Sequence, residues 1–212
     1  VMTATRYPIK QSLTGKVVTV ISKEQLERSK GKTMGEVLNT QAGIIVNGSS
    51  NVLGTNQDVY VRGAAAGKTL ILLDGVPAYD ASGISGAFDL NFIAVDQVER
   101  VEILKGSQST LYGSDAIAAV IHIISKKGGS KKLNANATLA AGTYGTFRAD
   151  VGAGGTISKT NYNVQYSKIY SNGFSTAIDQ AGNKGFDKDG IDENIFRAGI
   201  NQKINDKIAL RL

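Results

Sequence analysis

The chain has 212 residues, enough for one large domain or two small ones, and it contains 25 Gly, 2 Pro and no Cys or Trp. The absence of cysteine excludes a disulfide framework, a thiolate metal site and a cysteine nucleophile. A formal net charge of +6 would suit a nucleic-acid partner. However, lysine and arginine are scattered along the chain, and no nucleic-acid-binding motif accompanies them. We therefore predict no nucleic-acid partner.

The first part of the chain predicts alternating short strands and helices. The opening residues have neither a basic start nor an apolar core, so they do not read as a secretory signal peptide. The β-branched run Val17–Ile21 predicts a strand. Ser22 is placed to cap a following helix, and Thr33 with Glu36 forms a capping-box pattern at the start of a second helix over Thr33–Leu38.

Further apolar segments predict the remaining strands of this part. They are residues 42–46, 59–63, 70–75, 101–104 and 120–124. Lys105 and Gly106 end one of these strands, and we predict a turn at Tyr112 and Gly113. Strands of this length interleaved with short helices predict a small mixed sheet with flanking helices, which is an α+β domain.

Two features that resemble enzyme motifs do not meet their requirements. Residues 63–69 nearly match a phosphate-binding loop, but the spacing is one residue short, and a strand follows where a helix should bind phosphate. His122, the only histidine, lies in an apolar run without a nucleophile motif nearby. We predict a buried, hydrogen-bonded structural histidine and no enzymatic activity.

From Leu133 onward, apolar and polar residues alternate in five successive segments. The apolar members are Leu133, Ala135, Ala137 and Leu139; Phe147, Ala149, Val151 and Ala153; Tyr162, Val164 and Tyr166; Phe196, Ala198, Ile200 and Ile204; and Ile208, Leu210 and Leu212. A period of two is typical of strands with one apolar face. The pattern fits the wall of a transmembrane β-barrel and equally an ordinary half-buried antiparallel sheet.

The run from Val101 to Lys127 resembles the closing segment of the plug domain of TonB-dependent outer-membrane receptors. The matching residues are Glu99, Arg100, Glu102, Gly106, Ser109, Tyr112, Gly113, Ser114 and Ala116. The chain departs from the family pattern at three places. Ser107 replaces a usual proline, Ala118 and Ala119 replace a frequent Gly pair, and His122 replaces a usual asparagine.

This resemblance implies a plug domain over residues 1–127, followed over residues 128–212 by the first strands of a truncated transmembrane β-barrel. Barrels of this kind close with about 22 strands, so five strands cannot close one. The implied function is TonB-energised uptake of a scarce, bulky nutrient across the outer membrane of a Gram-negative bacterium. Val1, Met2, Thr3 and Ala4 would be the end of the segment that contacts TonB, and outer-membrane lipid would surround the strands.

Two polar, Gly- and Ser-rich loops, at residues 47–57 and 77–89, correspond to the plug apex loops that touch substrate in this family. Both resemble loops of the cobalamin transporter branch, which favours a corrinoid ligand. By that resemblance, Asn47, Leu53, Ile84 and Ser85 would contact the ligand. Plain solvent-exposed loops are the alternative for each single residue. A ferric-siderophore receptor of the same fold is the first alternative function, and a soluble or secreted β-rich binding module is the second.

A third loop, at residues 173–194, is rich in carboxylates. Oxygen ligands at alternate positions near a glycine suit calcium, and the segment Asp187–Gly190 resembles a calcium-binding loop of the cobalamin transporter. The predicted ligands are Asp179, Asp187, Asp189 and Asp192. A solvated acidic loop without metal is the alternative, and no other cofactor is expected.

Overall fold

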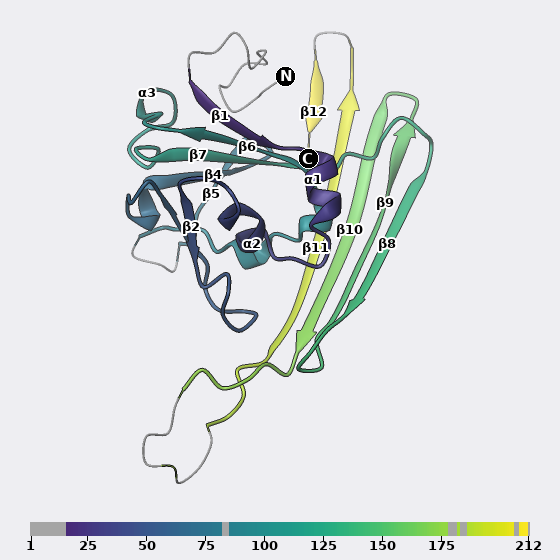
Figure 1. Cartoon of the computed structure of the whole chain (residues 1–212). Helices are drawn as coiled ribbons and strands as arrows, with labels where there is room; N and C mark the ends of the chain where they lie inside the picture. The colour runs from purple at the N-terminus through teal and green to yellow at the C-terminus, as the bar shows by residue number, and fades with distance from the viewer. Residues whose placement is uncertain (1–15, 82–84, 178–181, 183–185, 206–207, 212) are drawn as a thin grey trace. The chain divides into compact units, whose positions relative to one another are not determined.

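The computed structural model describes residues 16–81, 85–177, 182, 186–205 and 208–211 (Figure 1). The chain divides into two compact units. The first comprises Val1–Ser50 and Asn56–Ser125, and the second comprises Asn51–Thr55 and Lys126–Leu212.

The two longest helices of the first unit begin where the capping residues predict. They are α1 (Lys23–Arg28) and α2 (Met34–Asn39), and their N-caps are Ser22 and Thr33. Each cap accepts a hydrogen bond from the backbone N–H three residues later, and that later residue, Glu36 in α2, bonds back to the cap. No helix in the described part of the chain is both long and apolar enough to cross a membrane.

A five-stranded mixed sheet forms the centre of the first unit, in the order β1-β6-β7-β4-β5. Only β4 and β7 run parallel. The strands are β1 (Val17–Ile21), β4 (Thr69–Leu73), β5 (Val76–Ala78), β6 (Val98–Lys105) and β7 (Ala119–Ser125). A separate hairpin pairs β2 (Ile44–Asn47) with β3 (Asp58–Val61). The short helices are α3 (Ser109–Tyr112) and the 3₁₀ turns η2 (Ala66–Lys68), η3 (Leu90–Phe92) and η4 (Val95–Gln97).

Two local predictions for this unit need correction. The segment before Gly113 is the short helix α3 rather than only a turn, because the Gly113 N–H reaches the Ser109 carbonyl at 2.8 Å. Strand β5 occupies the start of the predicted loop 77–89. Pro77 is tolerated there because β5 lies at the sheet edge, where a proline does not remove a needed ladder bond.

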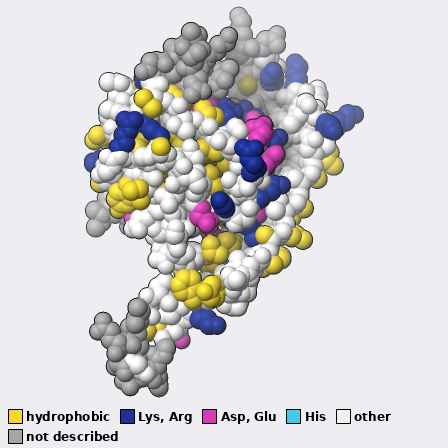
Figure 2. Space-filling model, viewed as in Figure 1, with side chains coloured by type: hydrophobic (Ala, Val, Ile, Leu, Met, Phe, Trp, Pro, Cys, Tyr) yellow, Lys and Arg dark blue, Asp and Glu magenta, His cyan; other side chains and the backbone are white. Residues whose placement is uncertain are grey.

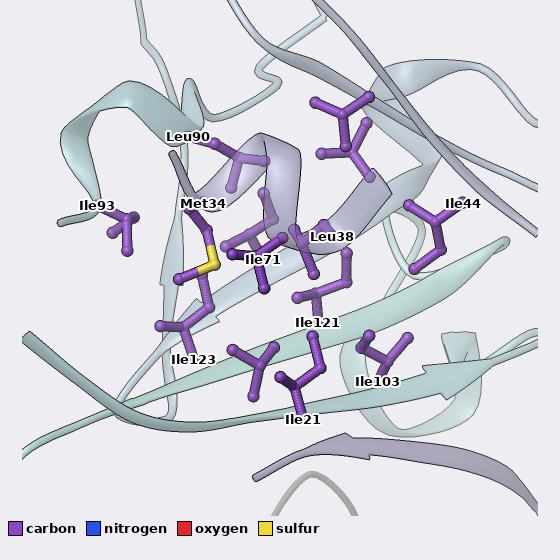
Figure 3. Packing of buried hydrophobic residues seen from close by; sticks show 14 of the residues in the cluster. Ile21, Met34, Leu38, Ile44, Ile71, Leu90, Ile93, Ile103, Ile121 and Ile123 are labelled. Carbon is purple, nitrogen blue, oxygen red and sulfur yellow. The ribbon is translucent and has the colours of Figure 1, made fainter. Parts of the chain in front are cut away.

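Alternate residues of the central strands build the main core. Ile71, Ile103, Ile121 and Ile123 are all buried, and they pack in one cluster with Met34 and Leu38 of α2 and with Leu90 of η3 (Figure 3). The intervening residues face the other side of the sheet. There Leu70, Leu72, Leu104 and Val120 form a second, smaller cluster with Ala116. The β-branched runs of the sequence are therefore buried on both faces.

The second unit is a five-stranded antiparallel meander in the order β12-β11-β10-β9-β8. Its strands are β8 (Asn134–Ala141), β9 (Phe147–Ile157), β10 (Thr160–Ser171), β11 (Ile191–Lys203) and β12 (Ala209–Arg211). The β9–β10 turn (158–159) and the β11–β12 connection (204–208) lie at one end of the sheet, and the β8–β9 connection (142–146) lies at the other. At this second end, residues 172–190 form a long connection between β10 and β11.

Strand pairing aligns the alternating residues into rows. One row joins Ala137, Val151, Tyr166 and Phe196, and another joins Ala135, Ala153, Val164 and Ala198. The large members of these rows are exposed, and hydrophobic side chains lie along the right margin of this sheet in Figure 2. Polar side chains, including the buried Asp150, Gln165 and Ser167, occupy the opposite face. The predicted antiparallel strands with one apolar face are confirmed.

The predicted acidic loop is shorter than residues 173–194. Strand β11 begins at Ile191, so Asp192 lies in the strand and pairs with Tyr170 across the ladder. Ile191, Glu193 and Ile195 are half-buried and alternate with the exposed Asp192 and Asn194, so the strand pattern already begins at Ile191.

Candidate ligand-binding site

The two predicted apex loops are joined by one carboxylate. The backbone N–H of Gln57, which ends the first loop, donates to Oδ1 of Asp89, which ends the second, at 3.2 Å. Asp89 also caps η3, since it accepts from the Asn91 N–H at 3.0 Å and from Asn91 Nδ2 at 3.3 Å. These loops are therefore held together at a fixed point, although the sequence separates Gln57 and Asp89 by 32 residues.

The side chain of Gln57 anchors the first loop to the body of the domain. It is only 3% exposed and lies against α2, where a Cβ added to Gly35 would stand 2.2 Å from Gln57 Oε1. At the beginning of the loop, Ser49 Oγ donates to the Val46 carbonyl at 2.8 Å. The loop is thus fixed at its beginning by a buried hydrogen bond of Ser49 and at its end by the packing of the buried Gln57 side chain against α2.

The residues predicted to touch the ligand are distributed over these loops. Asn47 is exposed at the end of β2, opposite Asp58 in the hairpin. Ser85 is exposed in the second loop, and Ile84 lies outside the described residues. Leu53 is half-buried and belongs to the stretch grouped with the second unit, so its position beside Asn47 stays a prediction.

Ser85 lies against a segment that the sequence did not link to the site. A Cβ added to Gly67 would stand 2.7 Å from the Ser85 carbonyl oxygen and 3.3 Å from its Cβ. The Ala87 N–H donates to Ser85 Oγ at 3.3 Å, which turns the chain back after this contact. The second loop is therefore supported at Ser85 by Gly67 and at Asp89 by Gln57.

Two exposed aromatic residues near the second loop were not predicted as site residues. Tyr79 is 51% exposed and Phe92 is 53% exposed, and the Phe92 ring lies 6.2 Å from that of Phe88. Partial burial and the neighbouring Asp115 carboxylate raise the pKa of Tyr79, so the phenol stays protonated at neutral pH. For Tyr79, an aromatic side chain within a Gly- and Ser-rich segment was the available signal in the sequence, whereas residues 90–95 around Phe92 contain neither Gly nor Ser.

The acidic residues predicted to bind calcium make other interactions where the structure describes them. Asp189 Oδ2 accepts from the Thr176 N–H at 2.9 Å and from Thr176 Oγ1 at 2.8 Å, and these bonds lower the pKa of Asp189. Asp192 forms an ion pair with Lys168. No group of three or more His, Cys, Asp or Glu side chains gathers within the described ranges. Asp179 and the predicted TonB-contacting residues 1–4 lie outside them.

The family model described as "TonB-dependent Receptor Plug Domain" matches residues 10–120, which is more than half of the chain. The chain belongs to this family. The matched range includes both apex loops, the five-stranded sheet up to the start of β7, and α3.

Relatives with sequence similarity include vitamin B12 transporters. The transporter BtuB of Vibrio cholerae serotype O1 is 36% identical over 128 residues, a stretch that covers 59% of this chain. The same stretch covers 20% of the relative, so the chain spans only a small part of the transporters it matches. The similarity supports the cobalamin branch that the apex loops indicated.

Solved structures with the same fold are TonB-dependent receptors for iron carriers. A mutant of the ferric enterobactin receptor PfeA of Pseudomonas aeruginosa has a TM-score of 0.68 at 22% identity, over 91% of this chain and 32% of that one. The siderophore receptor PirA of Acinetobacter baumannii gives 0.69 at 20% identity, over 92% and 31%. At these identities the likeness concerns the fold, and it confirms the predicted plug followed by barrel strands.

Proposed function

We propose that this TonB-dependent receptor plug and its strands belong to an outer-membrane receptor that imports a corrinoid with energy supplied through TonB. The observation that carries the proposal is the tie between Gln57 and Asp89, which fixes two polar loops on a plug whose sequence relatives are vitamin B12 transporters. Loops held in place lose less conformational entropy when a ligand binds.

The chemistry of the two loops favours a large, largely uncharged ligand. Asn47 and Ser85 offer exposed amide and hydroxyl groups, and Tyr79 and Phe92 offer exposed aromatic surface. Neither loop contains an arginine. A strongly anionic iron carrier would be better matched by cationic side chains, because charge-assisted hydrogen bonds are the stronger ones.

The exposed apolar rows of the second unit support an outer-membrane location. A strand that faces lipid on one side and a polar interior on the other requires this alternation. The Val151, Tyr166 and Phe196 row would then contact outer-membrane lipid, and Asp150, Gln165 and Ser167 would face the interior. A secreted β-rich binding module predicts instead that the whole protein stays soluble without detergent.

Calcium at the acidic loop remains part of this proposal. Asp187 and Asp189 would supply oxygen ligands, with Asp179 or Asp192 as further ones, and the ion would order the connection between β10 and β11. The bonds from Thr176 to Asp189 already hold one carboxylate in place without metal. These bonds support a loop whose backbone conformation around Asp189 is fixed before calcium binds.

Titration of the full-length receptor in detergent with cyanocobalamin and with ferric enterobactin tests the proposal. We expect tight binding of the corrinoid and weak binding of the iron carrier. The double variant Asn47→Ala with Ser85→Ala should weaken corrinoid binding about tenfold or more, because each lost hydrogen bond contributes about 1 kcal/mol. Thr110→Ala, at an exposed threonine of α3 outside both loops, is the matched control. Tight binding of the iron carrier alone would contradict the proposal.

A further inference from the structure

Charge is distributed unevenly along the antiparallel sheet of the second unit. Four exposed lysines, Lys131, Lys132, Lys159 and Lys203, lie at the end that carries the β9–β10 turn and the connection 204–208. We call these four residues the lysine rim. The described acidic residues of this unit, which are Asp150, Asp187, Asp189, Asp192 and Glu193, all lie in the half of the sheet or the connection at the opposite end.

Backbone contacts bring the four lysines to one hairpin turn from three different segments of the chain, which are residues 131–132, residue 159 and the end of β11. The Lys203 N–H donates to the Lys159 carbonyl at 2.9 Å. The Lys131 carbonyl accepts from the Thr156 N–H at 2.8 Å, and the Lys132 carbonyl accepts from the Tyr162 hydroxyl at 2.9 Å. The partner residues Thr156, Lys159 and Tyr162 all lie in or next to the turn of the β9–β10 hairpin. Lys and Arg side chains are visible near this end in Figure 2.

No side chain of the lysine rim forms an ion pair with another described residue. The connection 204–208 also contains Asp206 and Lys207, whose formal charges cancel and which lie outside the described residues. The rim therefore carries four positive charges around one hairpin turn. Like charges repel one another, so the arrangement gains stability when an anionic surface covers it.

An exposed aliphatic side chain accompanies each part of the rim. Leu133 follows Lys132 and is 63% exposed, Ile157 precedes Lys159 by two positions and is 56% exposed, and Ile204 follows Lys203 and is 56% exposed. An apolar surface bordered by lysines suits the boundary of a bilayer, because a lysine can lay its methylene stem along the acyl region and place its ammonium among the headgroups.

We propose that the lysine rim binds the anionic headgroups of phospholipids, and that it does so in the leaflet reached by the β9–β10 turn and the connection 204–208. This inference rests on the proposed outer-membrane location. In such barrels the short turns face the periplasm, and the long loops face outward. The rim would thereby fix the depth and tilt of this wall in the membrane on its periplasmic side.

Native mass spectrometry of the full-length receptor with phosphatidylglycerol and phosphatidylethanolamine tests the inference. A lysine near an anionic lipid surface contributes about a fivefold change in affinity. We expect the wild type to retain phosphatidylglycerol over phosphatidylethanolamine. Changing all four rim lysines to glutamine should reduce that preference at least tenfold, and raising the salt concentration should reduce it in the wild type.

Two matched variants accompany this experiment. Changing Lys23, Lys30, Lys68 and Lys188 to glutamine removes the same charge elsewhere and should leave the lipid preference unchanged. Changing the four rim lysines to arginine keeps the charge and should preserve the preference. Heat-dependent migration on gels shows for each variant that the barrel is folded.

The outcomes separate the inference from the proposed function. A folded, detergent-dependent barrel with equal retention of both lipids, or with an unchanged preference in the glutamine variant, overturns the lysine rim alone. A full-length protein that stays soluble without detergent and shows no heat-dependent migration overturns the outer-membrane proposal and the rim together.

Discussion

Glu102 and His122 lie opposite each other in the antiparallel β6–β7 ladder, and both are buried. Arg100 Nε donates to Glu102 Oε1 at 3.0 Å, so Glu102 stands between a guanidinium and an imidazole. Burial lowers the pKa of His122, and Arg100 acts in the same direction, although Glu102 and Asp74 oppose them. His122 is therefore neutral in the folded domain at pH 7.

The buried imidazole makes stability depend on pH. The folded pKa of His122 lies below the ordinary value of about 6.5, so the unfolded chain binds more protons as the pH falls below that value. Stability is fully present above about pH 6.5 and decreases toward lower pH by at most about 1.4 kcal/mol per pH unit. Urea unfolding at pH 7.5 and 5.5 measures this loss. His122→Asn should reduce it, and an equal loss in both proteins would mean that His122 does not contribute.

Asp89 should be the most sensitive residue of the apex loops. Asp89→Ala leaves the N–H groups of Gln57 and Asn91 without their acceptor, and we expect a loss of about 1–2 kcal/mol in the free energy of unfolding. Asp89→Asn keeps one oxygen acceptor and should lose less than half of that. Urea unfolding of both variants gives the comparison. Equal losses would show that the negative charge, rather than the shared acceptor, joins the loops.

Gly128 should not tolerate a side chain. A Cβ there would stand 2.0 Å from the Tyr162 carbonyl oxygen and 2.4 Å from the Gly155 nitrogen, which are both backbone atoms. We expect Gly128→Ala to destabilise the second unit by about 1–3 kcal/mol, because the backbone must move. Gly142→Ala is the control, since its Cβ would meet only Thr146 atoms at 3.5 Å or more. Similar unfolding midpoints for the two variants would contradict the close approach at Gly128.

A charged side chain on the exposed apolar face of the second unit's sheet should destabilise the protein in a bilayer. Val164 is 43% exposed in an apolar row, and Val164→Lys should cost about 2–4 kcal/mol of folding free energy in vesicles if the site lies near the bilayer midplane. Asn136→Lys, on the polar face, should cost less than about 1 kcal/mol. Guanidinium titration of the full-length protein in vesicles measures both. The reverse order would mean that the assigned faces are exchanged.

Calcium should bind to the full-length receptor through the connection between β10 and β11. Calorimetry should show lower calcium affinity after Asp187→Ala with Asp189→Ala, and calcium should strengthen corrinoid binding in the wild type only. Ser175→Ala is a control within the same connection. Identical calcium binding in wild type and variant would mean that the carboxylates of this loop are solvated and bind no calcium, and that Asp189 only accepts hydrogen bonds from Thr176.

The sequence predicted those parts of the fold that depend on local chemistry or on strict periodicity. Ser22 and Thr33 are capping residues whose partners lie three positions away, and the confirmed helices begin at them. The rows through Val151 and Val164 follow from a period of two, because strands that share an apolar face can pair only in registers that align it. Neither feature needs knowledge of distant contacts.

Contacts between distant segments were beyond the reach of these patterns. The bond between Gln57 and Asp89 joins segments that are 32 residues apart. Strand β5 is a different case, because the two-residue Asp74-Gly75 turn joins it locally to β4, and Pro77 argued against a strand in that segment. Of the predicted ligand residues, Asn47 and Ser85 are exposed in the loops, and their contact with a corrinoid is still a prediction, as it is for Leu53 and Ile84.

The most direct test of the proposed receptor is uptake of radiolabelled cyanocobalamin by Gram-negative cells that lack their own outer-membrane corrinoid receptor and express the full-length protein. We predict uptake that requires TonB and that falls at least tenfold in the variant Asn47→Ala with Ser85→Ala, while Thr110→Ala takes up the label as the wild type does. Uptake no greater than in cells without the protein, with the folded receptor present in the outer membrane, would contradict corrinoid transport.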